Sequence, residues 1–437
     1  MKRKLFAVLL GVALLLAGCN ALDSNNLYAL PQRSEEYREL QTTVEAAMGK
    51  GSYSAPVSGA NRQAIQQADL DGDGVEEILV FTKLEGSRPL KVLVFRRTEA
   101  GYAKICTLEG DGTAFDSVQY AQIDGQPGLE LLLSRRIGEQ VQQFLSVYTL
   151  NGSTMTELMS SAYTAYAVAD MDLDERSDLL VLRANADGPH AFAEFYRFQD
   201  GELRKNAEAS LSTGADSIKR VLSGDVALKS PAVFVASAYD EHNLITDVFA
   251  LKNGVFTNIT QNDESGQSAQ TVRNYYVYST DIDNDNLIEL PNTVPLAAVQ
   301  GDEQSFGQYR IVWYNLSLKG VRSDKISTYH SFAEGWFLYL PEDWCQHLCV
   351  TKRLDNGLAG TELSRLEPNG VRTRFVTIYV FSGEQAQALS QSDGRFLIAQ
   401  RGEICYAAAL TEQAGLDEEQ LRTRFSFISP ELFPAAE

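Results

Sequence analysis

Histidine is scarce in this sequence, and the short motifs that mark common active sites are absent. The 437 residues include four histidines, which lie in different segments at positions 190, 242, 330 and 347. The chain has no Gly-x-Ser-x-Gly, His-Glu-x-x-His, phosphate-binding loop or dinucleotide-binding fingerprint. The sequence therefore assigns no nucleophile and no general base, and we expect a protein that is not an enzyme.

Basic residues and long apolar runs are also few. Lys and Arg number 38 against 58 Asp and Glu, which gives a formal net charge of −20. An acidic body of this kind repels phosphates, so nucleic acid and anionic lipid headgroups are not expected as its partners. The apolar run at residues 5–16 is too short to cross a bilayer as a permanent helix.

What the chain does contain is an acidic nine-residue segment, which recurs at Asp69–Glu77, Asp170–Asp178 and Asp281–Glu289. Each copy carries carboxylates at positions 1, 3, 5 and 9. With this spacing a tight loop directs several oxygens at one Ca²⁺ ion, and the backbone carbonyl of position 7 adds another. The pattern predicts two to three structural calcium ions. The expected ligands are Asp69, Asp71, Asp73, Val75, Glu77, Asp170, Asp172, Asp174, Arg176, Asp178, Asp281, Asp283, Asp285, Leu287 and Glu289, of which Val75, Arg176 and Leu287 contribute carbonyl oxygens.

Two weaker copies, at residues 122–130 and 223–231, complete the series. The five segments, named loops 1 to 5 in chain order, start 53, 48, 53 and 58 residues apart, a period within the range of β-propeller blades. Loops 2 and 4 have lost most of their carboxylates and are poor metal candidates. In loop 3, Glu175 stands where a left-handed backbone is needed, so we expect this site to be weaker or distorted.

A β-strand, not a helix, is expected after each acidic loop. The loops run into apolar segments, and position 12, where an EF-hand has its bidentate Glu, is Val80, Val181 or Asn292. Short β-rich runs also lie between the loops, at residues 90–95, 144–148, 193–198, 246–251 and 310–314. These patterns predict four-stranded sheets and argue against an EF-hand.

The repeated nonapeptides resemble those of FG-GAP and VCBS repeat proteins, whose blades are also found in integrin α-chain heads. The resemblance covers residues 55–330 and implies a mainly β fold, a β-propeller of about five four-stranded blades with calcium as a structural staple. The alternative is that the Asp- and Gly-rich segments are solvated acidic turns, because these residues favour turns for conformational reasons alone.

The amino terminus predicts export and lipidation. Three basic residues at 2–4 precede the apolar run, and Leu16-Ala-Gly-Cys19 resembles the lipobox of bacterial lipoproteins. This resemblance implies a signal peptide at residues 1–18, an acylated Cys19 and a membrane-anchored, extracytoplasmic protein. Removal of the three basic residues with the signal peptide would bring the formal charge to −23.

A lipidated polar linker and a short helix are expected over residues 19–54. Ser34 is a candidate N-cap, Leu40, Val44 and Met48 form an apolar stripe, and Gly49 begins the helix stop. Amphipathic stripes usually pack on a core, so we expect this helix to cover the propeller, not to bind a partner.

The composition changes after residue 330, which predicts a small α/β domain over residues 331–437. Strands are expected near residues 349–352, 374–381, 396–399 and 405–410, and helices at 383–389 and, capped by Asp417, at 418–424. Cys345 and Cys349 flank a histidine, but no second pair has a spacing suited to zinc. A disulfide from either residue to Cys405 and free thiols are both consistent with export.

These observations favour a monomeric, non-catalytic lipoprotein whose calcium-stabilised propeller binds an unidentified protein or glycan. The alternative is a glycosidase-like, glycan-active enzyme with carboxylates at the propeller axis. Three or more Asp or Glu side chains that converge away from the calcium loops would favour the enzyme.

Overall fold

The computed structural model describes residues 35–138, 142–262, 264–274, 277–299, 301–355 and 358–429. The predicted signal peptide, the lipidation site Cys19 and the N-cap Ser34 lie outside this part of the chain. Within it, no helix has both the length and the apolar character needed to cross a membrane.

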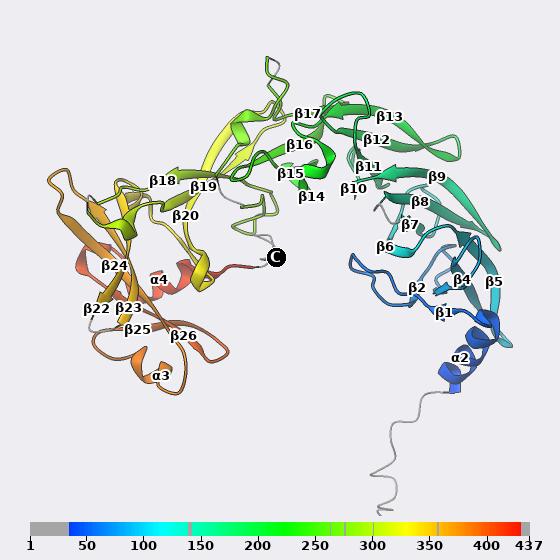
Figure 1. Cartoon of the computed structure of the whole chain (residues 1–437), viewed down its shortest axis with the longest axis horizontal. Helices are drawn as coiled ribbons and strands as arrows, with labels where there is room; N and C mark the ends of the chain where they lie inside the picture. The colour runs from blue at the N-terminus through cyan, green and yellow to red at the C-terminus, as the bar shows by residue number, and fades with distance from the viewer. Residues whose placement is uncertain are drawn as a thin grey trace, which may run out of the picture.

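Antiparallel sheets of four or five strands make up most of the structure and follow one another along an open arc (Figure 1). The fold is therefore mainly β, as the sequence predicted. The first sheet contains β1 (Ser52–Tyr53), β2 (Ile65–Ala68), β3 (Glu77–Lys83), β4 (Leu90–Thr98) and β5 (Gly101–Gly110). The second contains β6 (Ala114–Ala121), β7 (Glu130–Ile137), β8 (Gln142–Asn151) and β9 (Thr154–Tyr163). The third contains β10 (Ala165–Ala169), β11 (Asp178–Arg183), β12 (Phe192–Gln199) and β13 (Glu202–Ser210).

The remaining sheets continue the arc. The fourth contains β14 (Ile218–Ala227), β15 (Ser230–Ala238), β16 (Leu244–Lys252) and β17 (Val255–Asn258). The fifth contains β18 (Leu290–Pro295), β19 (Tyr309–Leu316), β20 (Arg322–Ser331), β21 (Trp336–Tyr339) and β27 (Phe425–Phe427). The sixth contains β22 (Leu348–Asp355), β23 (Leu358–Leu366), β24 (Arg372–Phe381), β25 (Phe396–Arg401) and β26 (Ile404–Leu410).

Neighbouring sheets are joined by apolar cores. Phe81 of the first sheet packs edge-on against Phe115 of the second, with ring centroids 5.2 Å apart. Similar clusters join the second sheet to the third, the third to the fourth, and the fourth to the fifth. The β-rich runs predicted between the loops lie in β4, β8, β12, β16 and β19. Sheets that follow one another in the chain thus bury apolar side chains against each other.

The predicted amphipathic helix is α2 (Glu35–Met48), and it covers the first sheet. Val44 is fully buried there, with Leu40 and Met48 packed beside it against Ile78 and Phe95. Gly49 follows the helix with a φ of +59°, the left-handed conformation that commonly ends a helix. The apolar stripe therefore packs on the body of the protein, as expected.

The carboxyl-terminal segment folds onto the fifth sheet. The sixth sheet carries α3 (Ala386–Leu389) and α4 (Glu418–Arg424), and Asp417 caps α4 in a capping box with Gln420. The boundary predicted between residues 330 and 331 falls within β20, and the last strand, β27, pairs with β21. One core joins Trp336 of the fifth sheet to Trp344 and to strands of the sixth.

Leu421 provides a test of this shared core. Its side chain is fully buried in the cluster that contains Trp336 and Trp344, so we expect Leu421→Ala to lower the free energy of unfolding by about 2–5 kcal/mol. Denaturant unfolding followed by tryptophan fluorescence measures the change. Glu419→Ala, at an exposed position of the same helix, is the control, and an equal loss in both variants would contradict the shared core.

Candidate metal sites in the acidic loops

Loops 1, 3 and 5 share one backbone arrangement, built around the carboxylate at position 1. In loop 5, Asp281 accepts hydrogen bonds from the backbone N–H groups of Asp285 (3.1 Å) and Asn286 (2.8 Å). Asp170 accepts from the N–H groups of residues 174 and 175, which are again positions 5 and 6. Asp69 accepts from those of residues 72 and 74, which are positions 4 and 6. The carboxylate at position 5 in turn accepts the N–H of position 7 in all three loops. These bonds close the chain into a tight turn that brings the acidic side chains together.

The carboxylates of each acidic loop converge on one point. In loop 5, one oxygen from each of Asp281, Asp283, Asp285 and Glu289 lies within 4.8 Å of the others. Loops 1 and 3 bring together three carboxylates under the same limit: Asp69, Asp71 and Glu77, and Asp170, Asp172 and Asp178. Asp73 and Asp174, predicted as ligands, are not members of these groups. Each of these loops therefore brings together at least three carboxylates that could hold a metal ion.

The carboxylate at position 9 is buried in every one of these loops. Glu289 is fully buried and accepts the backbone N–H of Ile282 at 3.1 Å. Glu77 accepts that of Leu70 at 3.1 Å, and Asp178 that of Met171 at 3.0 Å. Burial raises the pKa of Glu289, and it raises the pKa of Asp178 to about 7. A buried negative charge requires a positive partner.

A basic side chain from the same sheet reaches each group of carboxylates. Lys325 Nζ lies 2.9 Å from Asp283, 2.5 Å from Asp285 and 3.0 Å from Glu289. Arg96 pairs with Asp71 and, at 2.8 Å, with Glu77. Arg197 pairs with Asp172 and lies 3.5 Å from Asp178. None of these three residues was predicted from the sequence, because each lies 19 or more residues after the carboxylates it meets.

Loops 2 and 4 do not assemble a comparable group. Loop 2 keeps the turn, since Glu130 accepts the N–H of Ile123 at 2.6 Å, but only Asp124 stands beside it. In the region predicted as loop 4, residues 223–227 belong to β14, and a turn at Leu228 and Lys229 leads directly into β15. The expectation that these two copies are poor metal candidates agrees with this geometry.

Loop 3 carries backbone strain. Its residues at positions 4 and 6, Leu173 and Glu175, adopt positive φ angles of 63° and 70°. Loop 1 has Gly72 and Gly74 at these positions, and loop 5 has asparagines. In addition, Arg176 pairs with Asp174 and lowers the pKa of that carboxyl group. The left-handed backbone at Glu175, expected from the sequence to be unfavourable, is thus present.

The donor set of the three loops fits a hard divalent cation. Three or four carboxylate oxygens within 4.8 Å of one another match the oxygen ligands that Ca²⁺ prefers. No sulfur or imidazole joins these groups, so the chemistry does not match a zinc site. In loops 1 and 5 the carboxylates outnumber the facing basic group by at least three to one, which leaves negative charge for a cation.

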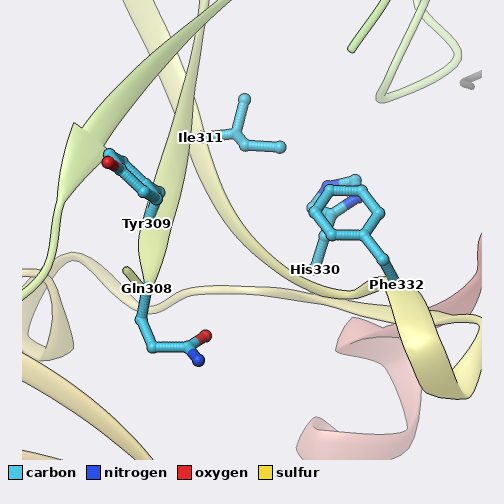
Figure 2. Close-up of a pocket in the computed structure, with 5 residues that line it drawn as sticks. All are labelled: Gln308, Tyr309, Ile311, His330 and Phe332. Carbon is cyan, nitrogen blue, oxygen red and sulfur yellow. The ribbon is translucent and has the colours of Figure 1, made fainter. Parts of the chain in front are cut away.

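Among the hollows in the described part of the chain, two are small. One, of about 30 Å³, is lined by Gln308, Tyr309, Ile311, His330 and Phe332 (Figure 2), and it is large enough for a water molecule but not for an organic ligand. The other, of about 250 Å³, adjoins loop 3 and is lined by residues that include Leu173, Lys229 and Leu318. Both are smaller than most ligand pockets.

The described cysteines, Cys106, Cys345, Cys349 and Cys405, are free thiols. Of the two alternatives left open by the sequence, the structure therefore shows the reduced form. Burial raises the pKa of the Cys106 thiol to about 11 and also raises the pKa of Cys345 and Cys349. These three thiols are protonated at neutral pH and are poor nucleophiles.

The strain in loop 3 generates a prediction. Glycine adopts the left-handed backbone without the steric cost that Glu175 incurs, so Glu175→Gly is expected to stabilise the protein by about 1 kcal/mol. Glu175→Ala removes the same charge but keeps a Cβ atom, and it should lack this gain. Thermal unfolding in EDTA compares the variants, and equal stability of the two would show that charge, not backbone strain, dominates.

His330 predicts a pH dependence of stability. Its ring is buried, stacks on Phe337 at 4.8 Å, and approaches Thr328 Oγ1 at 2.9 Å. Burial lowers its pKa from 6.5 to about 3, so the unfolded chain binds a proton that the folded chain excludes. The contribution to stability is complete above pH 6.5 and is lost as the pH falls toward 3.

The measurement compares wild type with His330→Gln, in denaturant at pH 7, 6, 5 and 4. The difference in unfolding free energy should change in favour of the variant by about 1.4 kcal/mol per pH unit below 6.5. His242→Gln, at an exposed position, is the control. A difference that does not vary with pH would contradict the assignment.

No protein-family model and no curated protein matches this chain. Among solved structures, it is similar to the rhamnogalacturonan lyase YesW, with 11% identity and a TM-score of 0.30 over 73% of this chain and 76% of that one. The Bacillus licheniformis rhamnogalacturonan lyase PL11 is 13% identical, with a TM-score of 0.30 over 80% of this chain and 61% of that one. A Lactobacillus plantarum protein is 11% identical, with a TM-score of 0.26 over 83% and 96%. Likeness at this level gives no argument about function.

Proposed function

We propose that the chain is a calcium-stabilised, non-catalytic binding scaffold, anchored to a membrane outside the cytoplasm through lipidated Cys19. The observation that supports the proposal is the convergence of carboxylates in loops 1, 3 and 5, at the same place in three different sheets. Calcium at these points would join the two strands that flank each loop. Its role would be structural, because the ligands belong to turns that lead directly into strands.

The proposed architecture is a β-propeller of about five four-stranded blades, formed by the first five sheets, with a small α/β unit over residues 331–437. The order of strands within the second, third and fourth sheets follows the chain, as in propeller blades. The proposed partner is a protein or a glycan, bound by a monomer through loops of the propeller.

A scaffold is preferred to a glycosidase because of where the acidic residues gather. Among the described residues, the groups of three or more metal-capable side chains are those of loops 1, 3 and 5. The convergent carboxylates are therefore accounted for by the proposed metal sites.

Calcium addition tests the structural role. With dissociation constants of about 0.1–1 mM, typical of extracellular modules, about 5 mM calcium should stabilise each occupied loop by roughly 1–2.3 kcal/mol relative to EDTA. Asp283→Ala and Asp71→Ala should each reduce this calcium-dependent rise in melting temperature. Thermal unfolding together with metal quantification provides the measurement.

The control is Asp393→Ala, which removes a well-exposed carboxylate that pairs only with nearby residues at the edge of the sixth sheet. This variant should retain the full calcium effect. If wild type showed no shift with calcium and bound no metal, the loops would be acidic turns and the proposed function would fail.

A further inference from the structure

We propose that Arg96, Arg197 and Lys325 are internal counter-ions, which hold loops 1, 3 and 5 closed in the absence of metal and which a metal ion must displace. This inference rests on the proposed metal-binding function of the loops. It concerns what the chain itself supplies at these points, and it predicts how strongly each loop retains an ion.

The position of the basic residues is the same in two sheets. In the first sheet Ile78 pairs with Phe95, and in the third Leu179 pairs with Tyr196. One step further along each ladder, the carboxylate at position 9 faces Arg96 or Arg197. A β-bulge directly precedes this place in the first, second, third and fifth sheets. Bulges change the direction of nearby side chains, and these bulges lie beside the buried carboxylate at position 9.

The fifth sheet reaches the same result by a different residue. Asn315 faces Glu289 across the ladder and donates a hydrogen bond to it at 2.8 Å. The positive charge comes from Lys325, which is the extra residue of the bulge, since Tyr314 pairs with Asp324 and Trp313 with Ile326. A cation therefore reaches the group of carboxylates although the facing position is occupied by an amide.

The two remaining sheets act as internal comparisons. In the second sheet, Leu131 pairs with Tyr148, so Glu130 faces Thr149, which is neutral. In the fourth sheet, Ala232 pairs with Ala250, so the equivalent residue is the apolar Leu251. The three loops with convergent carboxylates are the ones that a basic side chain enters, and the two without such a group face neutral residues. The match between charge and countercharge in five sheets is the basis of the inference.

The basic side chains are placed so that they can leave. The side chains of Arg96, Arg197 and Lys325 are 25%, 28% and 26% exposed, so they lie at the boundary between the loop and the solvent. An ion that entered the loop would replace three contacts of Lys325 with shorter metal–oxygen bonds, and the lysine would move into water. Metal and lysine thus compete for the same carboxylates, so the contacts of the lysine weaken the binding of the metal.

The number of basic groups ranks the loops. Loop 5 has four carboxylates at positions 1, 3, 5 and 9 against Lys325, which leaves a formal charge of −3. Loop 1 also leaves −3, with four carboxylates at these positions against Arg96. Loop 3 has four carboxylates against Arg197 and Arg176, which leaves −2. Together with the strain at Leu173 and Glu175, this ranking makes loop 3 the weakest of the three metal sites.

The test uses the full chain with Lys325→Met, which keeps the apolar stem and removes the charge. Melting temperature is measured in EDTA and in calcium, and calcium affinity is measured by titration calorimetry. We expect the variant to melt several degrees below wild type in EDTA, to recover in calcium, and to bind one calcium ion about tenfold more tightly. Lys325→Arg, which retains a cation, should behave like wild type.

Lys91→Met is the matched control, because Lys91 pairs at 2.6 Å with the exposed Glu109, which is not a member of the carboxylate groups of loops 1, 3 and 5. It should change neither the calcium affinity nor the difference between EDTA and calcium. If Lys325→Met bound calcium with unchanged affinity while wild type bound it normally, the inference would be wrong and the proposed function would stand. If neither chain bound calcium but Lys325→Met was less stable than Lys91→Met in EDTA, the counter-ion would be supported and the calcium function would fail. A variant that folded in neither condition, while Lys325→Arg folded, would overturn the inference, because metal would then not replace the lysine.

Discussion

A buried carboxylate at the end of each acidic loop has to be paired, and the arrangement of the surrounding repeat follows from that requirement. Glu77, Glu130, Asp178 and Glu289 each accept the backbone N–H of the residue at position 2 of the same loop. That residue is apolar and buried in all four loops. The hydrogen bond therefore ties the beginning of a loop to the strand that leaves it, and it removes two polar groups from an apolar environment at once.

The same loops connect neighbouring repeats. The N–H at position 8 of loop 2 donates to the carbonyl of Asp69 in loop 1 at 3.0 Å, and that of loop 3 donates to the carbonyl of Gln122 at 2.6 Å. In loop 5, the N–H of Ile288 donates to the carbonyl of Asp225 at 2.8 Å. Gly72 and Gly128 lie so close across the first of these contacts that a Cβ atom on either would meet backbone atoms at 2.6 Å or less. The contact with loop 1 therefore leaves no room for a side chain at Gly128 of loop 2, although loop 2 lacks a metal-binding group.

This arrangement separates two consequences of the repeated sequence. The turn with its internal hydrogen bonds is present in loop 2 as well as in the three acidic loops, so it does not require the full set of carboxylates. The convergence of oxygens is restricted to loops 1, 3 and 5, where a basic residue also enters. The hydrogen-bonded turn and the convergence of carboxylates are therefore distinct properties of the nonapeptide, because loop 2 has the first without the second.

The sequence by itself determined the elements whose signals are local. The loops are specified by the spacing of carboxylates and by glycine or asparagine at positive φ, and α4 is specified by Asp417 and Gln420, three residues apart. Strand β23 was not predicted, because its sequence includes Gly360 and the buried polar residues Thr361 and Glu362, and pairing with β22 and β24 outweighs its weak local preference.

Only the tertiary structure decided which residues complete the candidate sites. Arg96, Arg197 and Lys325 have no local signature, because their meeting with the acidic loops depends on strand register and on the position of a bulge. Long-range pairing also brings β27 back to the fifth sheet. Pairing with β15 likewise extends β14 into the region expected to be loop 4. Burial of the position 9 carboxylate is of the same kind, since it arises when neighbouring sheets pack and exclude water from a group that the sequence alone places at the edge of a turn.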